Sequence, residues 1–308
     1  MISGECRVFD GSVAMRRFLL AAVMFGAVSA AQAADMPDFL RGSILPTLST
    51  PIRNWDGWYV GGQVGYSSAD MDFSHAPKTQ TNFTLRNSVL QEPISQWSLL
   101  SKNHAQATGF GAFVGRNYQW EDIVLGVEAN YNYMTSLSSS STNSMRLLIV
   151  NPAGENAPAG HTHSYDTTLS GNAALQIKDV VTFRGRAGWA VENFLPYMFG
   201  GLAVGRVDVS RSATVSYDQY DDFVLPVQSG GTTINVPQHV LLGSNTYPVA
   251  TEHRTNSFVP GWTAGLGLEY MLWGNVFMRA EWEYVRFVSV KDISFSTNNV
   301  RAGVGYKF

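Results

Sequence analysis

The strongest constraint on the fold is a period of two in the hydropathy of separate segments of the chain. In the last segment, Val300, Ala302, Val304, Tyr306 and Phe308 fall on one face, and the residues between them are Arg, Gly or Lys. Successive side chains of a strand point to opposite faces, so this alternation predicts a strand with one apolar face. The pattern predicts eight strands, at 57–67, 107–118, 123–134, 180–191, 197–209, 261–272, 276–287 and 298–308. At 197–209 the apolar residues do not select a face.

The connections between these strands alternate in length. Those after the second, fourth and sixth strands are a few residues long, whereas those after the first, third and fifth cover roughly 70–104, 135–168 and 210–256. Short turns on one rim and long loops on the other are typical of bacterial outer-membrane barrels, whose short turns are periplasmic. The sequence therefore predicts an all-β protein: an eight-stranded antiparallel transmembrane β-barrel with short periplasmic turns and long extracellular loops.

Aromatic residues gather near both ends of the predicted strands. A bilayer selects two such girdles, one at each interface. The alternative is a soluble, lipocalin-like barrel with its apolar faces inward, but then the charged and glycine-rich faces would have to form the solvated exterior. The predicted girdle residues are Trp58, Trp120, Trp189 and Trp273 at the short-turn end, and Tyr66, Tyr131, Tyr133, Trp262, Trp282 and Tyr284 at the long-loop end.

The N-terminal region predicts export. Residues 15–33 combine a basic start, a short apolar run and a small-x-small cleavage site, which is the pattern of a signal peptide. Residues 1–14 are expected to be a non-native upstream extension, 34–54 an extended periplasmic leader and 55–308 the barrel. The single cysteine, Cys6, lies in the extension, so the exported chain has no disulfide. No apolar run after residue 33 approaches the roughly 20 residues of a membrane helix, which leaves a closed barrel as the membrane-spanning alternative.

The faces opposite the apolar ones carry charges that would point into the barrel. Eight strands leave an interior just wide enough for side chains to fill. Buried charges need partners, so mutual pairing would form a plug of salt bridges, with Arg301 next to Glu281 or Glu283. A narrow hydrophilic pore lined by the same residues is the alternative. The predicted lumen residues are Glu128, Arg184, Arg186, Glu269, Arg279, Glu281, Glu283, Arg301 and Lys307.

Several of these segments resemble the alphaproteobacterial small outer-membrane barrel family, which includes porin-like and opacity-type surface proteins and haemin-binding members. The resemblance rests on "GWYVGGQVGY", "FRGRAGWA", "LPYMFGGLAVG", "GWTAGLGLEY", "RAEWEYVRF" and "VRAGVGYKF". It implies location in the outer membrane of a Gram-negative cell and a structural, surface-exposed role. A small-solute porin or haemin receptor is the alternative. It also implies contact with outer-membrane lipids and lipopolysaccharide, and with host or environmental ligands through the loops. It further implies an assembly signal at Tyr306 and Phe308 that the outer-membrane assembly machinery would recognise.

Other functions have weaker support in the sequence. The net charge of −3 does not indicate a nucleic-acid partner. His161 and His163 are the candidate haem or metal ligands, but no further ligand set accompanies them, and no cofactor is expected. The serine run at 136–144 and the Glu252–His253 pair do not define a nucleophile with its base, so no enzyme activity is expected.

Overall fold

The computed structural model describes residues 53–308, which form nine antiparallel strands and two short helices. The expected extension, signal peptide and most of the leader lie outside the described residues. The helices are α2 (Lys78–Thr84) and α3 (Gln91–Ser95). Neither is long and apolar enough to cross a bilayer. The strands are β1 (Gly57–Asp72), β2 (Lys102–Trp120), β3 (Ile123–Val150), β4 (His161–Trp189), β5 (Phe194–Ser229), β6 (Thr232–Thr246), β7 (Ala250–Trp273), β8 (Val276–Phe287) and β9 (Ser294–Lys307).

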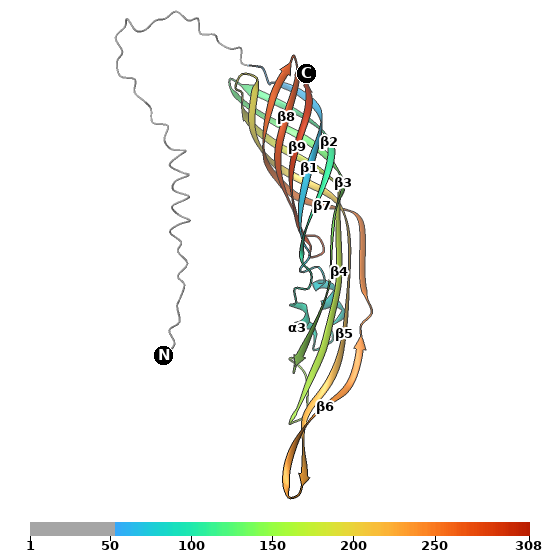
Figure 1. The fold of residues 1–308 in the computed structure, drawn as a ribbon. Helices are drawn as coiled ribbons and strands as arrows, with labels where there is room; N and C mark the ends of the chain where they lie inside the picture. The colour runs from blue at the N-terminus through green and yellow to red at the C-terminus, as the bar shows by residue number, and fades with distance from the viewer. Residues whose placement is uncertain (1–52) are drawn as a thin grey trace, which may run out of the picture. The chain divides into compact units, whose positions relative to one another are not determined.

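Eight of the nine strands close into a ring (Figure 1). The order is β1-β2-β3-β4-β5-β7-β8-β9, and β9 pairs back onto β1 from Tyr59↔Lys307 to Asp72↔Ser294. The prediction of an eight-stranded antiparallel barrel is confirmed. The ninth strand, β6, lies outside the ring and pairs with β5 from Ser216 to Ser229.

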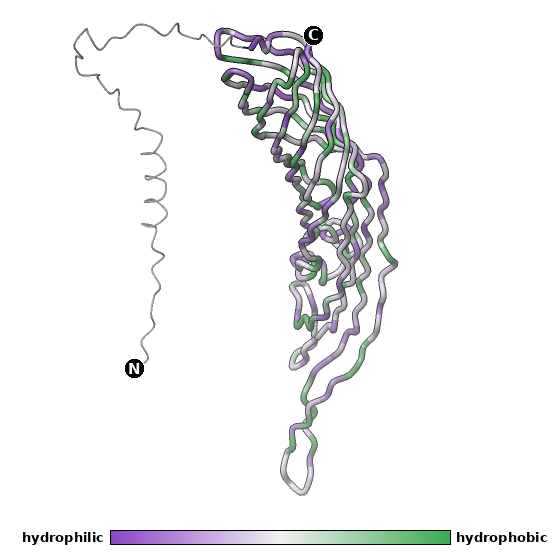
Figure 2. The backbone as a smooth tube through the Cα atoms, turned by 45° about the horizontal axis from the view of Figure 1, so that its top comes forward, coloured by the Kyte–Doolittle hydropathy of each residue, from purple (hydrophilic) through white to green (hydrophobic). Residues whose placement is uncertain are grey.

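The apolar faces of the barrel strands point outward. Val64, Phe110 and Leu202 are each at least 60% exposed, whereas the opposite faces are buried. Hydrophobic and hydrophilic residues alternate along the barrel strands in Figure 2. For β5, whose facing the sequence did not decide, Tyr197 and Phe199 point inward and Met198 points outward.

The long connections have more regular structure than loops. β3 and β4 stay paired as far as Val150↔Ser164, and β4 and β5 as far as His161↔Phe223. The serine run at 136–144 lies in the long loop predicted at 135–168, but it is part of β3. Beyond the barrel these strands form what we call the outer sheet: residues 135–150, 161–177 and 207–229, together with β6.

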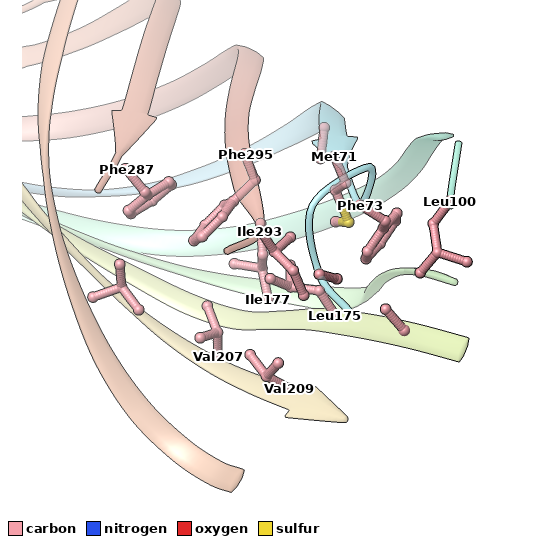
Figure 3. Close-up of a cluster of buried hydrophobic side chains, with 14 of the residues drawn as sticks. Met71, Phe73, Leu100, Leu175, Ile177, Val207, Val209, Phe287, Ile293 and Phe295 are labelled. Atoms are coloured by element: carbon pink, nitrogen blue, oxygen red, sulfur yellow. The ribbon is translucent and has the colours of Figure 1, made fainter. Parts of the chain in front are cut away.

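The first long connection packs onto this sheet. We call residues 73–101 the cap, which includes α2 and α3. Leu85, Leu90 and Ile94 of the cap are fully buried in one cluster with residues of the outer sheet, such as Leu169 and Leu175. Figure 3 shows the part of this cluster nearest the barrel. Burying these side chains supplies the outer sheet with a hydrophobic core, which continues into the mouth of the barrel.

Candidate functional site in the barrel lumen

Glu128 of β3 lies at the centre of the charged interior. Its carboxylate accepts a hydrogen bond from Arg184 Nη2 at 2.6 Å and another from Arg279 Nη1 at 2.8 Å. Arg186 Nη1 is 3.4 Å from the same group. All four side chains are at most 2% exposed. Three guanidinium groups on one carboxylate leave an excess of positive charge, which needs further acids nearby.

The other three carboxylates balance this excess. Arg184 Nη2 is also 2.6 Å from Glu281, and Arg186 Nη1 is 2.8 Å from Glu269. Arg301 bridges Glu281 and Glu283, with both nitrogen–oxygen distances 3.0 Å. The four arginines therefore meet four carboxylates in one buried network, which we call the charge layer.

Eight of the nine predicted lumen residues belong to the charge layer. Lys307 lies outside it. Its ammonium donates to the backbone carbonyls of Asn54 and Asp56, the second at 3.1 Å. Lys307 pairs with Tyr59 near the start of β1, so its place in the register takes it to the periplasmic rim instead of the charge layer.

Aromatic side chains in the lumen complete the charge layer. Tyr59 donates to Glu128 at 2.8 Å, and Tyr197 donates to Glu281 at 2.5 Å. The guanidinium of Arg184 stacks 4.0 Å from the centre of the Phe199 ring, which adds a cation–π contact. The predicted lumen residues do not include these aromatics: alternation places Tyr59 on the inner face without indicating a partner, and it leaves the facing of Tyr197 and Phe199 open.

An apolar layer lies on the periplasmic side of the charge layer. Phe277 makes an edge contact with Tyr59, with ring centroids 5.9 Å apart. Inward-facing glycines leave room for these rings: a Cβ at Gly61 would lie 2.1 Å from Phe113. A cue was present in the glycines that alternate along the inner faces. The layer consists of Trp55, Tyr59, Phe113, Val124, Ala190, Leu195, Tyr197, Phe199, Met271 and Phe277.

A second apolar layer closes the extracellular mouth. Phe287 and Phe295 stack with ring centroids 4.8 Å apart, and Ile293 packs beside them (Figure 3). Ile177 and Val207 reach the same cluster from β4 and β5. The interior of the barrel therefore contains an apolar layer, the charge layer and a second apolar layer in succession.

The two candidate haem or metal ligands have separate partners. His161 Nδ1 is 2.7 Å from Asp221, and His163 Nδ1 is 2.6 Å from Glu155. Within residues 53–308 no group of three or more His, Cys, Asp or Glu residues is placed to hold a metal ion. Burial opposes ionisation of Glu155, but hydrogen bonds from Tyr165 and His163 hold its pKa below the ordinary value. Each of these histidines is therefore paired with a carboxylate.

The residues considered for catalysis also serve structural contacts. The Ser141 hydroxyl accepts a hydrogen bond from the Ser101 backbone at 3.1 Å. Glu252 is held by Lys291 at 2.6 Å and by Arg211 at 2.8 Å. The Lys291 hydrogen bond, helped by Arg211 and opposed by burial, lowers the pKa of Glu252 to about 2. Glu252 therefore holds two cations, Arg211 and Lys291, where β7 pairs with β5.

The predicted girdle residues lie on the barrel exterior. Tyr284 is half-buried, and the other nine are exposed. At the end of β9, Tyr306 and Phe308 are exposed with ring centroids 5.2 Å apart, and the Phe308 N–H donates to the Trp58 carbonyl at 2.8 Å. Placement of these girdles at the two lipid interfaces stays a prediction.

The model of one protein family, described as "Outer membrane protein beta-barrel domain", matches residues 18–308. The chain belongs to this family. It is 22% identical over 265 residues to the 25 kDa outer-membrane immunogenic protein of Brucella ovis, covering 85% of this chain and 83% of that protein. It is 25% identical over 267 residues to the 22 kDa outer membrane protein of Rhizobium leguminosarum, covering 84% of this chain and 80% of that one.

Solved barrel structures were also matched. Neisserial surface protein A aligns with 82% of this chain and 97% of its own, at 15% identity and a TM-score of 0.32. Ail, the attachment invasion locus protein of Yersinia pestis, aligns with 82% and 99% at 11% identity and a TM-score of 0.28. Together with the barrel itself, membership of the outer-membrane barrel family identifies this chain as a surface protein of the outer membrane.

Proposed function

We propose that this outer-membrane barrel is closed to solutes and serves as an anchor that presents the outer sheet at the cell surface. The observation that carries the proposal is the contact of Arg184 with Glu128 and Glu281 inside the barrel, each at 2.6 Å. These side chains are at most 1% exposed, so the charges that would line a pore are bound to one another.

The layers on either side strengthen the barrier. A hydrated ion that passed through would have to displace the rings of Tyr59 and Phe277 and then those of Phe287 and Phe295. Opening the charge layer would leave buried charges without partners, which is strongly unfavourable. A closed lumen leaves the outer sheet and the cap as the parts of the chain able to meet other molecules.

The alternative function, a small-solute porin or haemin receptor, would require a different arrangement of these side chains. A porin needs the charge layer to part, and a haemin receptor needs a free imidazole such as that of His161 or His163. Both imidazoles lie within 3 Å of a carboxylate. We also propose that the chain has no enzymatic role, since Glu252 is occupied by Lys291 and Arg211.

Two partners complete the proposal. Lipopolysaccharide would contact exposed cations near the outer rim, including Arg286 and Lys102. The assembly machinery would recognise the exposed aromatics Tyr306 and Phe308 before the barrel closes.

Planar-bilayer recording of the refolded chain tests the closed lumen. We expect no stable conductance steps from the wild-type protein at a dose that inserts a known porin reliably. Large, stable steps whose ion selectivity changes in Glu281→Gln would overturn the proposal and support a pore. Haemin titration of the same sample, followed by absorbance, tests the receptor alternative. Saturable binding that is lost in His161→Ala/His163→Ala would favour that alternative.

A further inference from the structure

The outer end of β5 exposes the same face that is buried below it. Val209 and Val215 of β5 are buried beneath the cap, and Tyr217 packs against the edge of their cluster. Residues 225 and 227 continue this face by the period of two, yet Leu225 is 47% exposed and Val227 is 41% exposed. The core face of the outer sheet therefore runs on, uncovered, into the end of the strand.

This uncovered end is a two-stranded hairpin. We call residues 223–229 of β5 and 232–238 of β6 the apical hairpin, which turns at Gly230 and Gly231 with φ of 59° and 84°. The pairs Leu225↔Val236 and Val227↔Ile234 lie on one face, and Phe223 extends it. The opposite face is mixed: Gln228↔Thr233 is a polar pair and Pro226 lies opposite Asn235, whereas Val224↔Pro237 is apolar. The face of Leu225 and Val227 is therefore the more apolar of the two, and it is in contact with solvent.

Charge is missing from this part of the chain. Residues 223–251 contain no Asp, Glu, Lys or Arg, and His239 is the only titratable side chain in the range apart from Tyr247. The chain on either side is charged, with Asp221 and Asp222 before it and Glu252 after it. An uncharged apolar surface does not complement a charged partner. It is suited to the apolar part of a lipid bilayer with neutral headgroups, because charged groups are costly at membrane depth.

Two features disfavour a protein partner. Pro226 and Pro237 lie on the two strands, and a proline in a ladder has its missing N–H on the side away from the paired strand. Each outer edge therefore lacks a donor for an added strand, which opposes pairing with a second copy. The apolar face has only five large side chains, compared with the roughly 20–30 residues that each partner contributes to a stable protein interface.

We propose that the apical hairpin docks by its apolar face onto the headgroup–acyl boundary of a zwitterionic lipid bilayer, distinct from the bilayer that holds the barrel. The strand edges have unpaired backbone groups, so the hairpin lies in the interface and does not span it. From Val207 at the mouth to Ser229 at the tip, β5 extends roughly 70 Å along its length at the usual rise per residue. Figure 1 shows this hairpin at the end opposite the short turns.

The test uses the full chain in lipid nanodiscs, mixed with phosphatidylcholine vesicles and separated by flotation. Wild-type nanodiscs should float with the vesicles, and raising the salt concentration should not release them. Val227→Asp/Ile234→Asp places two charges on the apolar face and should weaken binding by about tenfold or more. Gln228→Asp/Asn235→Asp places the same charges on the opposite face and should bind like wild type. Heat-modified gel mobility of each variant verifies that the barrel is folded.

Several results would overturn the proposal: no flotation of the wild type, equal loss in both double variants, or release by salt. Self-association of the chain in detergent micelles, with no bilayer present, that is lost in Val227→Asp/Ile234→Asp would assign the face to a second copy instead. The inference rests on the proposed presentation of the outer sheet at the cell surface. It is independent of conductance, so a conducting lumen would leave the flotation result unchanged, and each proposal can fail alone.

Discussion

Arg184 of β4 and Glu281 of β8 meet inside the barrel, with Arg184 Nη2 2.6 Å from Glu281 Oε1. Their strands are not neighbours in the ring, because β3 and β5 flank β4 while β7 and β9 flank β8. The contact therefore crosses the lumen, and it ties together parts of the barrel that backbone pairing leaves apart.

Breaking this contact on one side should destabilise the barrel strongly. Glu281→Ala leaves the four arginines of the charge layer with three carboxylates, so one buried positive charge is unmatched, and we expect the free energy of unfolding to fall by about 3–5 kcal/mol. Arg184→Met/Glu281→Leu removes both charges and should lose less. Denaturant unfolding in detergent micelles, followed by tryptophan fluorescence, measures both. Lys102→Ala is the control, because its ion pair with Asp72 is exposed and contributes under about 1 kcal/mol. A larger loss in the double variant than in Glu281→Ala would contradict this reasoning.

Glycines beside the lumen rings should not tolerate a methyl group. In Gly61→Ala the new Cβ would lie 2.1 Å from Phe113 and 2.4 Å from the Val304 carbonyl oxygen. Overpacking of this kind typically costs about 1–3 kcal/mol. Gly185→Ala is the matched barrel control, since a Cβ there meets nothing within 4 Å. Heat-induced loss of folded gel mobility should occur at a lower temperature in Gly61→Ala alone, and equal midpoints would show that the lumen rings can move aside.

Glu252 should make the outer sheet sensitive to acid. Its pKa is about 2 in the folded chain, against an ordinary value of 4.5, chiefly because Lys291 donates to it. A depressed folded pKa adds stability above pH 5, and this stability is lost as the pH falls towards 2. We expect wild type to exceed Glu252→Gln by about 1–2 kcal/mol at neutral pH, after allowance for solvent screening. Denaturant midpoints at several pH values measure this difference, which should shrink through that window. A difference that stays constant with pH would exclude ionisation of Glu252 as the cause.

Phe308 should matter more for assembly than for the finished barrel. Its side chain is 70% exposed on the exterior, and the backbone bond to Trp58 does not depend on the side chain. Phe308→Ala should lower the amount in the outer membrane and raise periplasmic degradation, yet refold in micelles with near-normal heat resistance. Trp273→Ala removes another exposed aromatic from the same rim and should assemble normally. Wild-type surface levels for Phe308→Ala, together with failed refolding, would reverse the assigned role.

The barrel could be predicted because lipid and lumen make opposite demands on alternate residues. The outer sheet was harder to predict because neither face of 136–144 is apolar, and its serines form strand through pairing with Ala173 and Ala174 of β4. In β5 a cue was present: Val209, Ala213 and Val215 continue the alternation past the barrel. This alternation alone does not show what would cover the apolar face, because the cap that covers it lies far away in the sequence.

The pairing of charges in the lumen could be predicted from the residue types and the facing of the strands alone. These place acids and arginines inside the barrel, and buried charges need partners. The aromatic partners did not follow, because the facing of β5 depends on Tyr197 and Phe199 filling space that Gly267 and Gly265 leave on β7. Lys307 was misplaced because alternation gives the face of a residue but not its depth. Depth comes from the pairing of β9 with β1, which no single strand reveals.

The paired strands also decide where the chain can change in length. β4 and β5 pair from Gly188↔Tyr197 to His161↔Phe223, with one irregularity between Ile177 and Asp179. A single inserted residue within this ladder would turn every side chain beyond it to the other face, exposing the core of the outer sheet to water. The turns at 151–160 and at Gly230–Gly231 are free of this restriction. Foreign peptides for surface display should therefore be grafted at those turns, and natural insertions should accumulate there.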